Sequence, residues 1–172
     1  MKKSAILALA VAFFWWLGGH MVWAQKYDDK EHAELAKALK GVKTSLEKGL
    51  SASESQGKPI SAKFEMEDGK LQLSVYTMKG DKFSEVIVDH KTGKVAKTVA
   101  ITSGEDLTAA KAQSGAIAKA KVSLRAATEK AIKANKGFRA VSATPSLKDG
   151  HPVAEITLVK GEEFKTDSEK LD

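Results

Sequence analysis

Apolar and polar residues alternate strictly from Ile60 to Met66. A period of two residues is typical of a strand that buries one face. Asp68-Gly69 follows and predicts a tight hairpin turn, because such a turn needs positive φ at both central residues. The same pattern, interrupted by turn residues, predicts three further strands at 71–75, 83–88 and 95–101.

Apolar residues at helical spacing predict four helices around these strands. Each is preceded by a residue suited to cap a helix N-terminus, namely Asp28 or Asp29, Ser45, Ser103 and Ser123. Asp106 follows Ser103 at the spacing of a capping box. The sequence therefore predicts two pairs of helices, and each pair precedes a set of strands.

Two copies of one unit are predicted from internal similarity. A shift of 81 positions places identical residues on each other: Ser61-Ala62 on Ser142-Ala143, Asp68-Gly69 on Asp149-Gly150, Lys79-Gly80 on Lys160-Gly161, and Phe83 on Phe164. The third strand of the second copy is expected to be degraded, because polar residues 167–170 replace the apolar run 86–88.

The predicted fold class is therefore α+β, with two repeats that are each a helix packed on a small antiparallel β-meander. Extra N-terminal and connecting helices accompany them. The expected segments are a signal peptide at 1–24, an N-terminal helix at 25–43, a first unit at 44–101, a connecting helix at 102–121, and a second unit at 122–172 with a truncated third strand.

The first 24 residues have the order of a cleavable signal peptide. Lys2 and Lys3 precede an apolar run at 5–17, and small residues come before the expected cleavage between Ala24 and Gln25. The apolar run is shorter than the roughly 20 residues that a membrane-spanning helix needs. We therefore expect export to the periplasm, with secretion as the alternative.

Export changes how the composition is interpreted. The chain has no cysteine, so the exported protein must rely on packing and hydrogen bonds instead of disulfides. All three tryptophans precede Gln25, which leaves few aromatic side chains for a core or for stacking on bases. The formal net charge of +6 therefore does not indicate a nucleic-acid partner.

Enzymatic motifs are weak. Ser45 and Lys48 form a Ser-x-x-Lys pattern and Lys91-Thr92-Gly93 matches a second element of serine penicillin-recognising enzymes, but the third element, Ser-Asp-Asn, is missing. A helix cap and a turn already explain both matches. We therefore predict no catalytic residue.

Metal and cofactor sites are not indicated either. His32, His90 and His151 fall on different predicted elements, and no second histidine follows His32 at zinc-ligand spacing. No glycine-rich phosphate loop and no nucleophile paired with a base is visible. We predict no metal ligand and no cofactor.

The stretch 108–140 is strongly basic. It contains a single acidic residue, Glu129, and the basic residues Lys111, Lys119, Lys121, Arg125, Lys130, Lys133, Lys136 and Arg139. Such a run usually marks a solvated helix face. The alternative is weak contact with an anionic membrane surface or an acidic partner.

Residues 44–95 resemble the PepSY family. The resemblance rests on the Ser-Leu helix start, the Asp-Gly hairpin, and a closing turn formed by Asp89, Thr92, Gly93 and Lys94. Residues 122–172 share the helix start and the hairpin but lack the closing turn. The resemblance implies an extracytoplasmic inhibitory or regulatory module, of a kind often attached to secreted peptidases, without catalytic residues.

The expected function is that of an exported, non-enzymatic module that binds a protein or peptide partner. An open edge at the third strand of the second unit is the expected docking place, where an extended peptide adds a strand to the sheet. Two alternatives stay open: an inhibitor of a secreted peptidase, and a protein that binds a small ligand or a metal between the two units.

Overall fold

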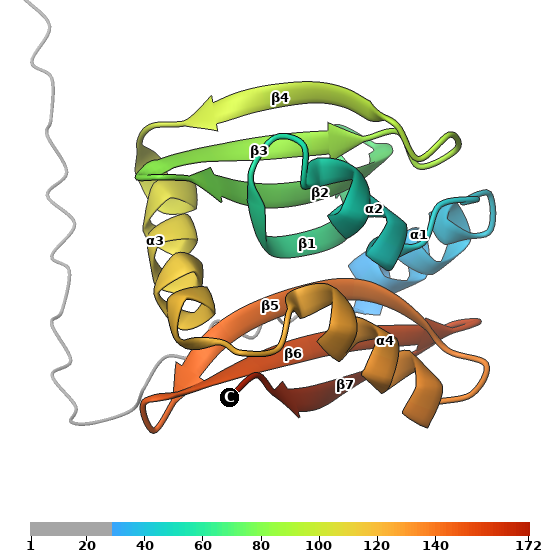
Figure 1. Cartoon of the computed structure of the whole chain (residues 1–172). Helices are drawn as coiled ribbons and strands as arrows, with labels where there is room; N and C mark the ends of the chain where they lie inside the picture. Colours follow the sequence, from blue (N-terminus) through green and yellow to red (C-terminus); the bar gives the residue numbers. More distant parts are fainter. Residues whose placement is uncertain (1–28) are drawn as a thin grey trace, which may run out of the picture.

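The computed structural model describes residues 29–172, so the predicted signal peptide and the Ala24–Gln25 cleavage site lie outside the described residues. The described chain forms four helices and seven strands (Figure 1). They are α1 Asp29–Leu39, α2 Leu46–Ser53, β1 Lys58–Glu67, β2 Lys70–Lys79, β3 Lys82–Val88, β4 Val95–Ile101, α3 Gly104–Lys119, α4 Leu124–Ala134, β5 Arg139–Lys148, β6 His151–Lys160 and β7 Glu163–Lys170. None of these helices is both long and apolar enough to cross a bilayer.

All seven strands belong to one antiparallel sheet in the order β4-β3-β2-β1-β5-β6-β7. The prediction of two repeats, each with its own small meander, is therefore wrong. The two sets of strands are joined where Ala62 of β1 lies opposite Ala143 of β5, next to Lys63 opposite Ser142. Strand edges carry unpaired N–H and C=O groups, and this pairing satisfies some of them in both strands.

The third strand of the second half is not truncated. β7 has eight residues, pairs with β6 from Glu163 to Lys170, and is no shorter than the seven-residue β3. Its polar residues remain in a strand because α4 supplies partners: Lys130 Nζ lies 2.5 Å from Glu169 Oε2, and Asn135 binds Asp167. In the first half, β4 pairs on the outer side of β3. Among the described residues, the second half has no such fourth strand on the outer side of β7.

Several local features recur 81 residues apart within this single sheet. The register of β1 shifts between Pro59 and Ser61, and that of β5 shifts between Ala140 and Ser142. Asp68 and Asp149 both take positive φ, 49° and 52°, in the first positions of their hairpin turns. The turn and bulge residues thus shape each half alike, although the halves share one sheet.

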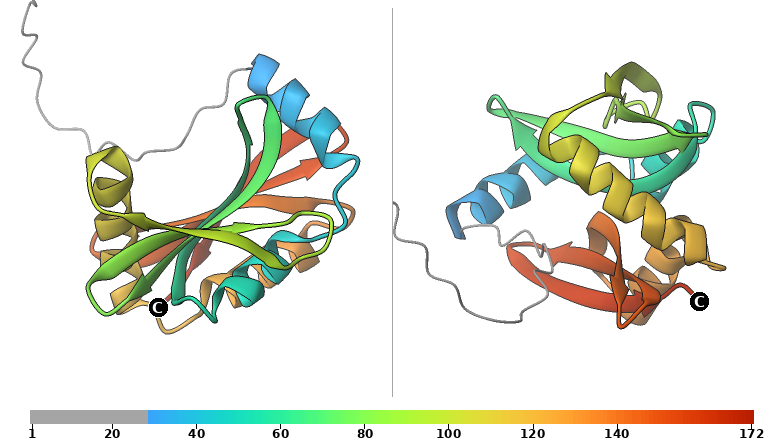
Figure 2. Two further views of the ribbon diagram at one scale, coloured as in Figure 1. Left: turned by 90° about the horizontal axis from the view of Figure 1, so that it is seen from above. Right: turned by 90° about the vertical axis from the view of Figure 1, so that its left-hand side faces the viewer.

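The helices are divided between different sides of the sheet. Figure 2 shows α2 and α4 next to each other, with α1 and α3 on opposite sides of the molecule. α2 contacts mainly β1, β2 and β3, and α4 contacts mainly β5, β6 and β7. α2 also contacts β5, α4 also contacts β1, and the two helices contact each other. Large buried side chains of the first half, including Leu46, Leu50, Phe64, Leu73 and Val75, belong to one hydrophobic core.

The second half contributes more small side chains to the same core. Its buried residues include Ala127, Ala131 and Ala154, together with Ile156 and Leu158. Ser45 and Ser123 cap α2 and α4, and their hydroxyls accept hydrogen bonds from Lys48 N at 3.3 Å and Ala126 N at 3.1 Å. Ser103 makes no such side-chain bond at the start of α3, where Gly104 has a φ of 77°.

Gly49 and Gly115 offer a paired test of this packing. A Cβ added at Gly49 in α2 would lie 2.6 Å from Leu73 Cδ2, whereas one at Gly115 in α3 would meet nothing within 4 Å. We expect Gly49→Ala to lower the free energy of unfolding by roughly 1–3 kcal/mol through overpacking. Gly115→Ala should raise it by roughly 0.5–1 kcal/mol, since alanine is the better helix former. Urea denaturation of both variants measures the difference, and equal effects would contradict the described α2–β2 contact.

Candidate functional site

The two outer strands of the sheet differ in character. β4 pairs only with β3, and its residues from Ala96 to Ala100 are all exposed. Val99, with 36% of its surface accessible, is one of the exposed large apolar side chains. A bare strand edge of this kind presents a row of free backbone donors and acceptors. β4 is therefore a candidate docking edge.

Features that usually protect an edge are scarce on β4. Its sequence, Val-Ala-Lys-Thr-Val-Ala-Ile, contains a single charged residue, Lys97, and no proline. Thr98 Oγ1 lies 3.4 Å from Gln56 Oε1, which connects the strand to the end of α2. β4 is thus fixed in place yet open along its outer side.

β7, where sequence analysis expects the open edge, is the better protected strand. Its eight residues include two glutamates, one aspartate and two lysines. Lys165 and Asp167 both bind Asn135, the residue just after α4, and Glu169 is paired with Lys130 of α4. Charged side chains on an edge disfavour pairing with another strand. β4 is therefore a better candidate for docking than β7, the strand that the sequence favours.

The predicted closing turn holds β4 against β3. The Asp89 carboxylate accepts hydrogen bonds from Lys91 N and Thr92 N, each at 2.8 Å. The Asp89 carbonyl accepts from Gly93 N at 2.7 Å, and Asp89 N donates to Lys94 O at 2.9 Å. These bonds from Thr92 and Lys91 to the carboxylate hold the pKa of Asp89 below its ordinary value.

The same turn anchors the link between α1 and α2. The His90 carbonyl accepts hydrogen bonds from Lys43 N at 3.1 Å and Thr44 N at 3.0 Å. Gly93 has a φ of 74°, and a Cβ there would lie 3.2 Å from Thr44 Oγ1. Asp89, Thr92, Gly93 and Lys94 therefore act together as a structural clamp beside β4.

The other predicted turn residues lie apart from one another. Asp68-Gly69 forms the turn between β1 and β2, and Asp149-Gly150 forms the turn between β5 and β6. Because β1 and β5 run antiparallel, these two turns lie at opposite ends of the sheet. The structure does not bring the two hairpin turns into one site.

The histidines are also separated. His32 of α1 stacks on Phe164 of β7 with ring centroids 4.1 Å apart, and His90 lies in the β3–β4 turn. His151 Nδ1 lies 3.0 Å from Asp172 Oδ2, a bond that lowers the pKa of Asp172. Among residues 29–172, no group of three or more His, Asp or Glu side chains could hold a metal ion.

The basic stretch does not form one free face. Arg125 pairs with Glu129 at 2.9 Å, and Lys119 Nζ lies 3.4 Å from Gly150 O. Arg139 is half-buried: its guanidinium donates to Leu39 O at 3.2 Å and Thr44 O at 3.3 Å, and it lies 5.6 Å from the centre of the Phe64 ring. Desolvation there lowers the pKa of Arg139. Arg139 thus connects the two halves. It does not belong to the exposed basic surface that the sequence predicts for lipid or acidic partners.

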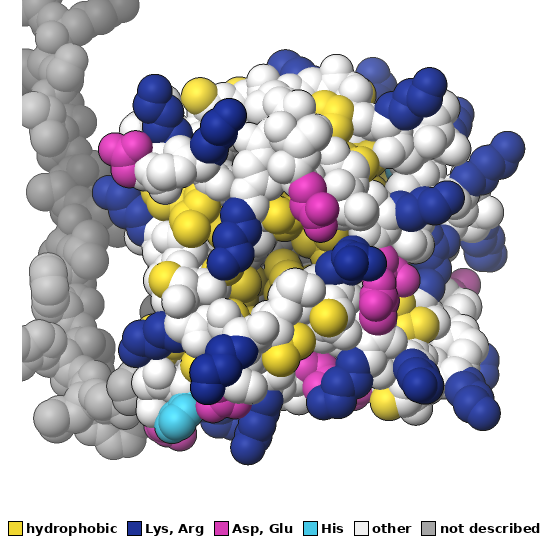
Figure 3. Space-filling model, in the orientation of Figure 1, with side chains coloured by type: hydrophobic (Ala, Val, Ile, Leu, Met, Phe, Trp, Pro, Cys, Tyr) yellow, Lys and Arg dark blue, Asp and Glu magenta, His cyan; other side chains and the backbone are white. Residues whose placement is uncertain are grey.

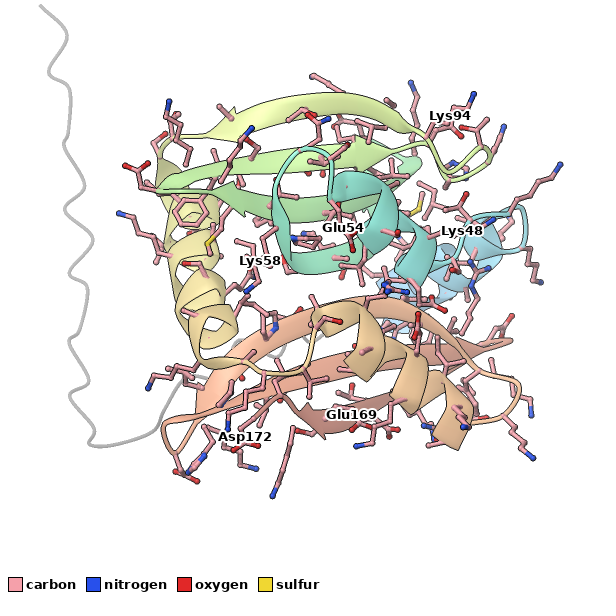
Figure 4. The ribbon with its side chains drawn as sticks, in the orientation of Figure 1. Lys48, Glu54, Lys58, Lys94, Glu169 and Asp172 are labelled. Atoms are coloured by element: carbon pink, nitrogen blue, oxygen red, sulfur yellow. The ribbon has the colours of Figure 1, made fainter. Side chains whose placement is uncertain are left out.

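A pocket of about 340 Å³ separates α2 from the link between α3 and α4. Figure 3 shows a hollow with apolar atoms on its floor in this region, and Figure 4 places Glu54 and Lys58 along its α2 side. Segments 50–59 and 117–125 supply the lining. Sequence analysis leaves open a ligand site between the two units but names none of the residues that line this pocket, because its two walls are far apart along the chain. The local signal in the sequence is weak: Val122 and Leu124 are apolar and lie between Lys121 and Arg125.

No protein-family model and no curated protein matches the chain. The PepSY resemblance therefore rests on the motif residues of this sequence. Among solved structures, the chain matches the crystal structure of a candidate lipoprotein from Clostridium difficile 630, with 11% sequence identity. That similarity covers 70% of this chain and 79% of the other, with a TM-score of 0.41.

The clamp at Asp89 predicts a dependence of stability on pH. Because the folded-state pKa of Asp89 lies below the ordinary value of 3.8, its contribution is present above that value and is lost as the pH falls through the folded-state pKa. We expect Asp89→Asn to lower stability at neutral pH, with the deficit disappearing in strong acid. Urea denaturation between neutral and acidic pH measures this. Asp81→Asn, which also removes a carboxylate from an exposed turn, is the matched control, and an equal pH-dependent deficit in both variants would contradict the clamp.

Proposed function

We propose that the protein is a non-enzymatic interaction module that binds an extended segment of a protein or peptide partner along β4. The observation that carries this proposal is the outer edge of β4, which is exposed over five successive residues and has one charge. The sheet behind it is wide, since β3, β2 and β1 continue it inward. An incoming strand would extend this sheet by β-augmentation.

Main-chain hydrogen bonds would supply most of the affinity. Each one contributes on the order of 0.5–1.5 kcal/mol net, so that several along a seven-residue strand produce useful binding. Side chains of the partner would lie beside those of β4 on the two faces of the sheet. Val99 and Ile101 would favour apolar neighbours on one face, where Lys97 would favour an acidic one.

The side chains with shifted pKa values in residues 29–172 take part in contacts that hold the structure together. Burial, aided by Asp106, raises the pKa of Tyr76, whose hydroxyl lies 2.7 Å from Asp106 Oδ1. Arg139 and Asp89 hold backbone groups, as described above. None of them lines the pocket, whose polar side chains are Glu54, Lys58, Lys121, Ser123 and Arg125.

A regulatory or inhibitory role in the periplasm or outside the cell is the narrower form of this proposal. The first 24 residues support export, and the PepSY resemblance of 44–95 supports regulation. Inhibition of a secreted peptidase fits the same edge, because peptidase substrates bind in extended form and an inhibitor could offer or capture such a strand. A panel of secreted peptidases assayed with the protein separates inhibition from simple binding.

A pair of edge variants tests the proposal. Peptides selected from a random displayed library on the chain from Gln25 onward should slow hydrogen exchange of the amides in β4. Val99→Glu should weaken their binding by about tenfold or more, which corresponds to about 1.4 kcal/mol. Thr166→Glu places the same charge on β7 and should leave binding unchanged. Selected peptides that protect β7 and not β4, or that bind the Val99→Glu variant equally well, would overturn the proposal.

A further inference from the structure

The pocket between α2 and the α3–α4 link has an apolar floor. Leu50, Ile117 and Leu124 line it although only 1%, 2% and 3% of their surfaces are accessible. Pro59, Ala120 and Val122 add further apolar atoms. Its volume of about 340 Å³ lies near the lower end of the range of roughly 300–1,000 Å³ that is typical of ligand pockets. The space therefore fits a small ligand with an apolar body.

The charges around the pocket are unequal. Lys58, Lys121 and Arg125 contribute three cations, whereas Glu54 contributes one carboxylate. Arg125 is paired with Glu129, but both side chains are about half exposed, and such a pair is worth only about 0–1 kcal/mol. Arg125 can therefore turn toward a ligand at little cost. The excess of positive charge favours an anionic group at the mouth of the pocket.

The two walls come from different halves of the sheet. Leu50, Glu54 and Lys58 belong to the first half, and Lys121 to Arg125 belong to the second. Lys121 N and Val122 N are held by the Leu171 carbonyl at 2.6 and 2.9 Å, which fixes the position of the second wall. A ligand in the pocket would thus contact both halves at once and a wall that is already in place.

We infer that this pocket binds a small amphiphile, an aliphatic monocarboxylate whose tail lies over Leu50, Ile117 and Leu124. Its carboxylate lies among Lys58, Lys121 and Arg125. Lysine and arginine bind carboxylates through charge-assisted hydrogen bonds, which are stronger than neutral ones. Burial of the tail adds about 25 cal/mol for each Å² of apolar surface removed from water. This site is separate from β4, so the inference does not rest on the proposed function.

Octanoate is the probe for a direct test. In a nuclear magnetic resonance titration of the chain from Gln25 onward, octanoate should shift the amide signals of residues 117–125 in a saturable way. 1-Octanol, which carries the same tail without the charge, should bind at least about tenfold more weakly. Added salt should weaken octanoate binding, because the rim of the pocket is exposed.

Two kinds of variant locate the site. The double variant Lys58→Gln/Lys121→Gln should weaken octanoate binding about tenfold or more, whereas Lys79→Gln/Lys111→Gln, with the same loss of charge away from the pocket, should not. Ala120→Leu should abolish binding by filling the space. Val99→Glu should bind octanoate normally, so that failure of this inference and failure of the β4 proposal are distinguishable. Thermal unfolding checks that each variant is folded.

Three outcomes would overturn the inference. They are the absence of saturable shifts with octanoate, equal binding of 1-octanol and octanoate, and octanoate binding that neither Ala120→Leu nor the Lys58→Gln/Lys121→Gln variant changes. Binding that is lost in those variants and kept in the Lys79→Gln/Lys111→Gln control would support it.

Discussion

The structure depends on the short pairing of β1 with β5. Ala62 and Ala143 face each other there, and both are buried. Backbone pairing at this point joins two strands from separate parts of the chain. Because of this contact the strands form one sheet, α2 and α4 lie next to each other, and the wall of the pocket from 50–59 meets the wall from 117–125. β4 and β7 are left as the outer strands for the same reason.

Local features of the fold could be predicted from the sequence because short-range chemistry decides them. Asp68-Gly69 and Asp149-Gly150 turn the chain through positive φ, and Ser45 and Ser123 cap their helices. The join between β1 and β5 could not be predicted in the same way. Backbone hydrogen-bonding groups form this join. The alternating side chains of β1 and β5 do not indicate that these two strands are neighbours in the sheet. The position of Arg139 could not be predicted either. The sequence places it in an exposed basic stretch, but it is half-buried and donates hydrogen bonds to Leu39 O and Thr44 O.

The candidate site shows where sequence patterns stop being informative. Polar residues 167–170 indicate a broken strand, yet contacts with Lys130 and Asn135 keep β7 intact. Tertiary contacts override local propensity in such cases. The closing turn around Asp89 is visible in the sequence, but its neighbour β4 becomes a candidate only when the order of strands is known. Predicting the pocket also requires the pairing of two distant strands, because this pairing brings its lining residues together.

The contrast between the two outer strands also governs how copies of this protein can associate. Continuous growth of a sheet from copy to copy would require β4 of each molecule to pair with β7 of the next, a head-to-tail contact that produces filaments. The charges and α4 contacts of β7 disfavour that arrangement. Pairing of β4 with β4 would use the same patch twice and stop at two copies. A protein with one receptive edge and one guarded edge can thus expose an unpaired strand without polymerising.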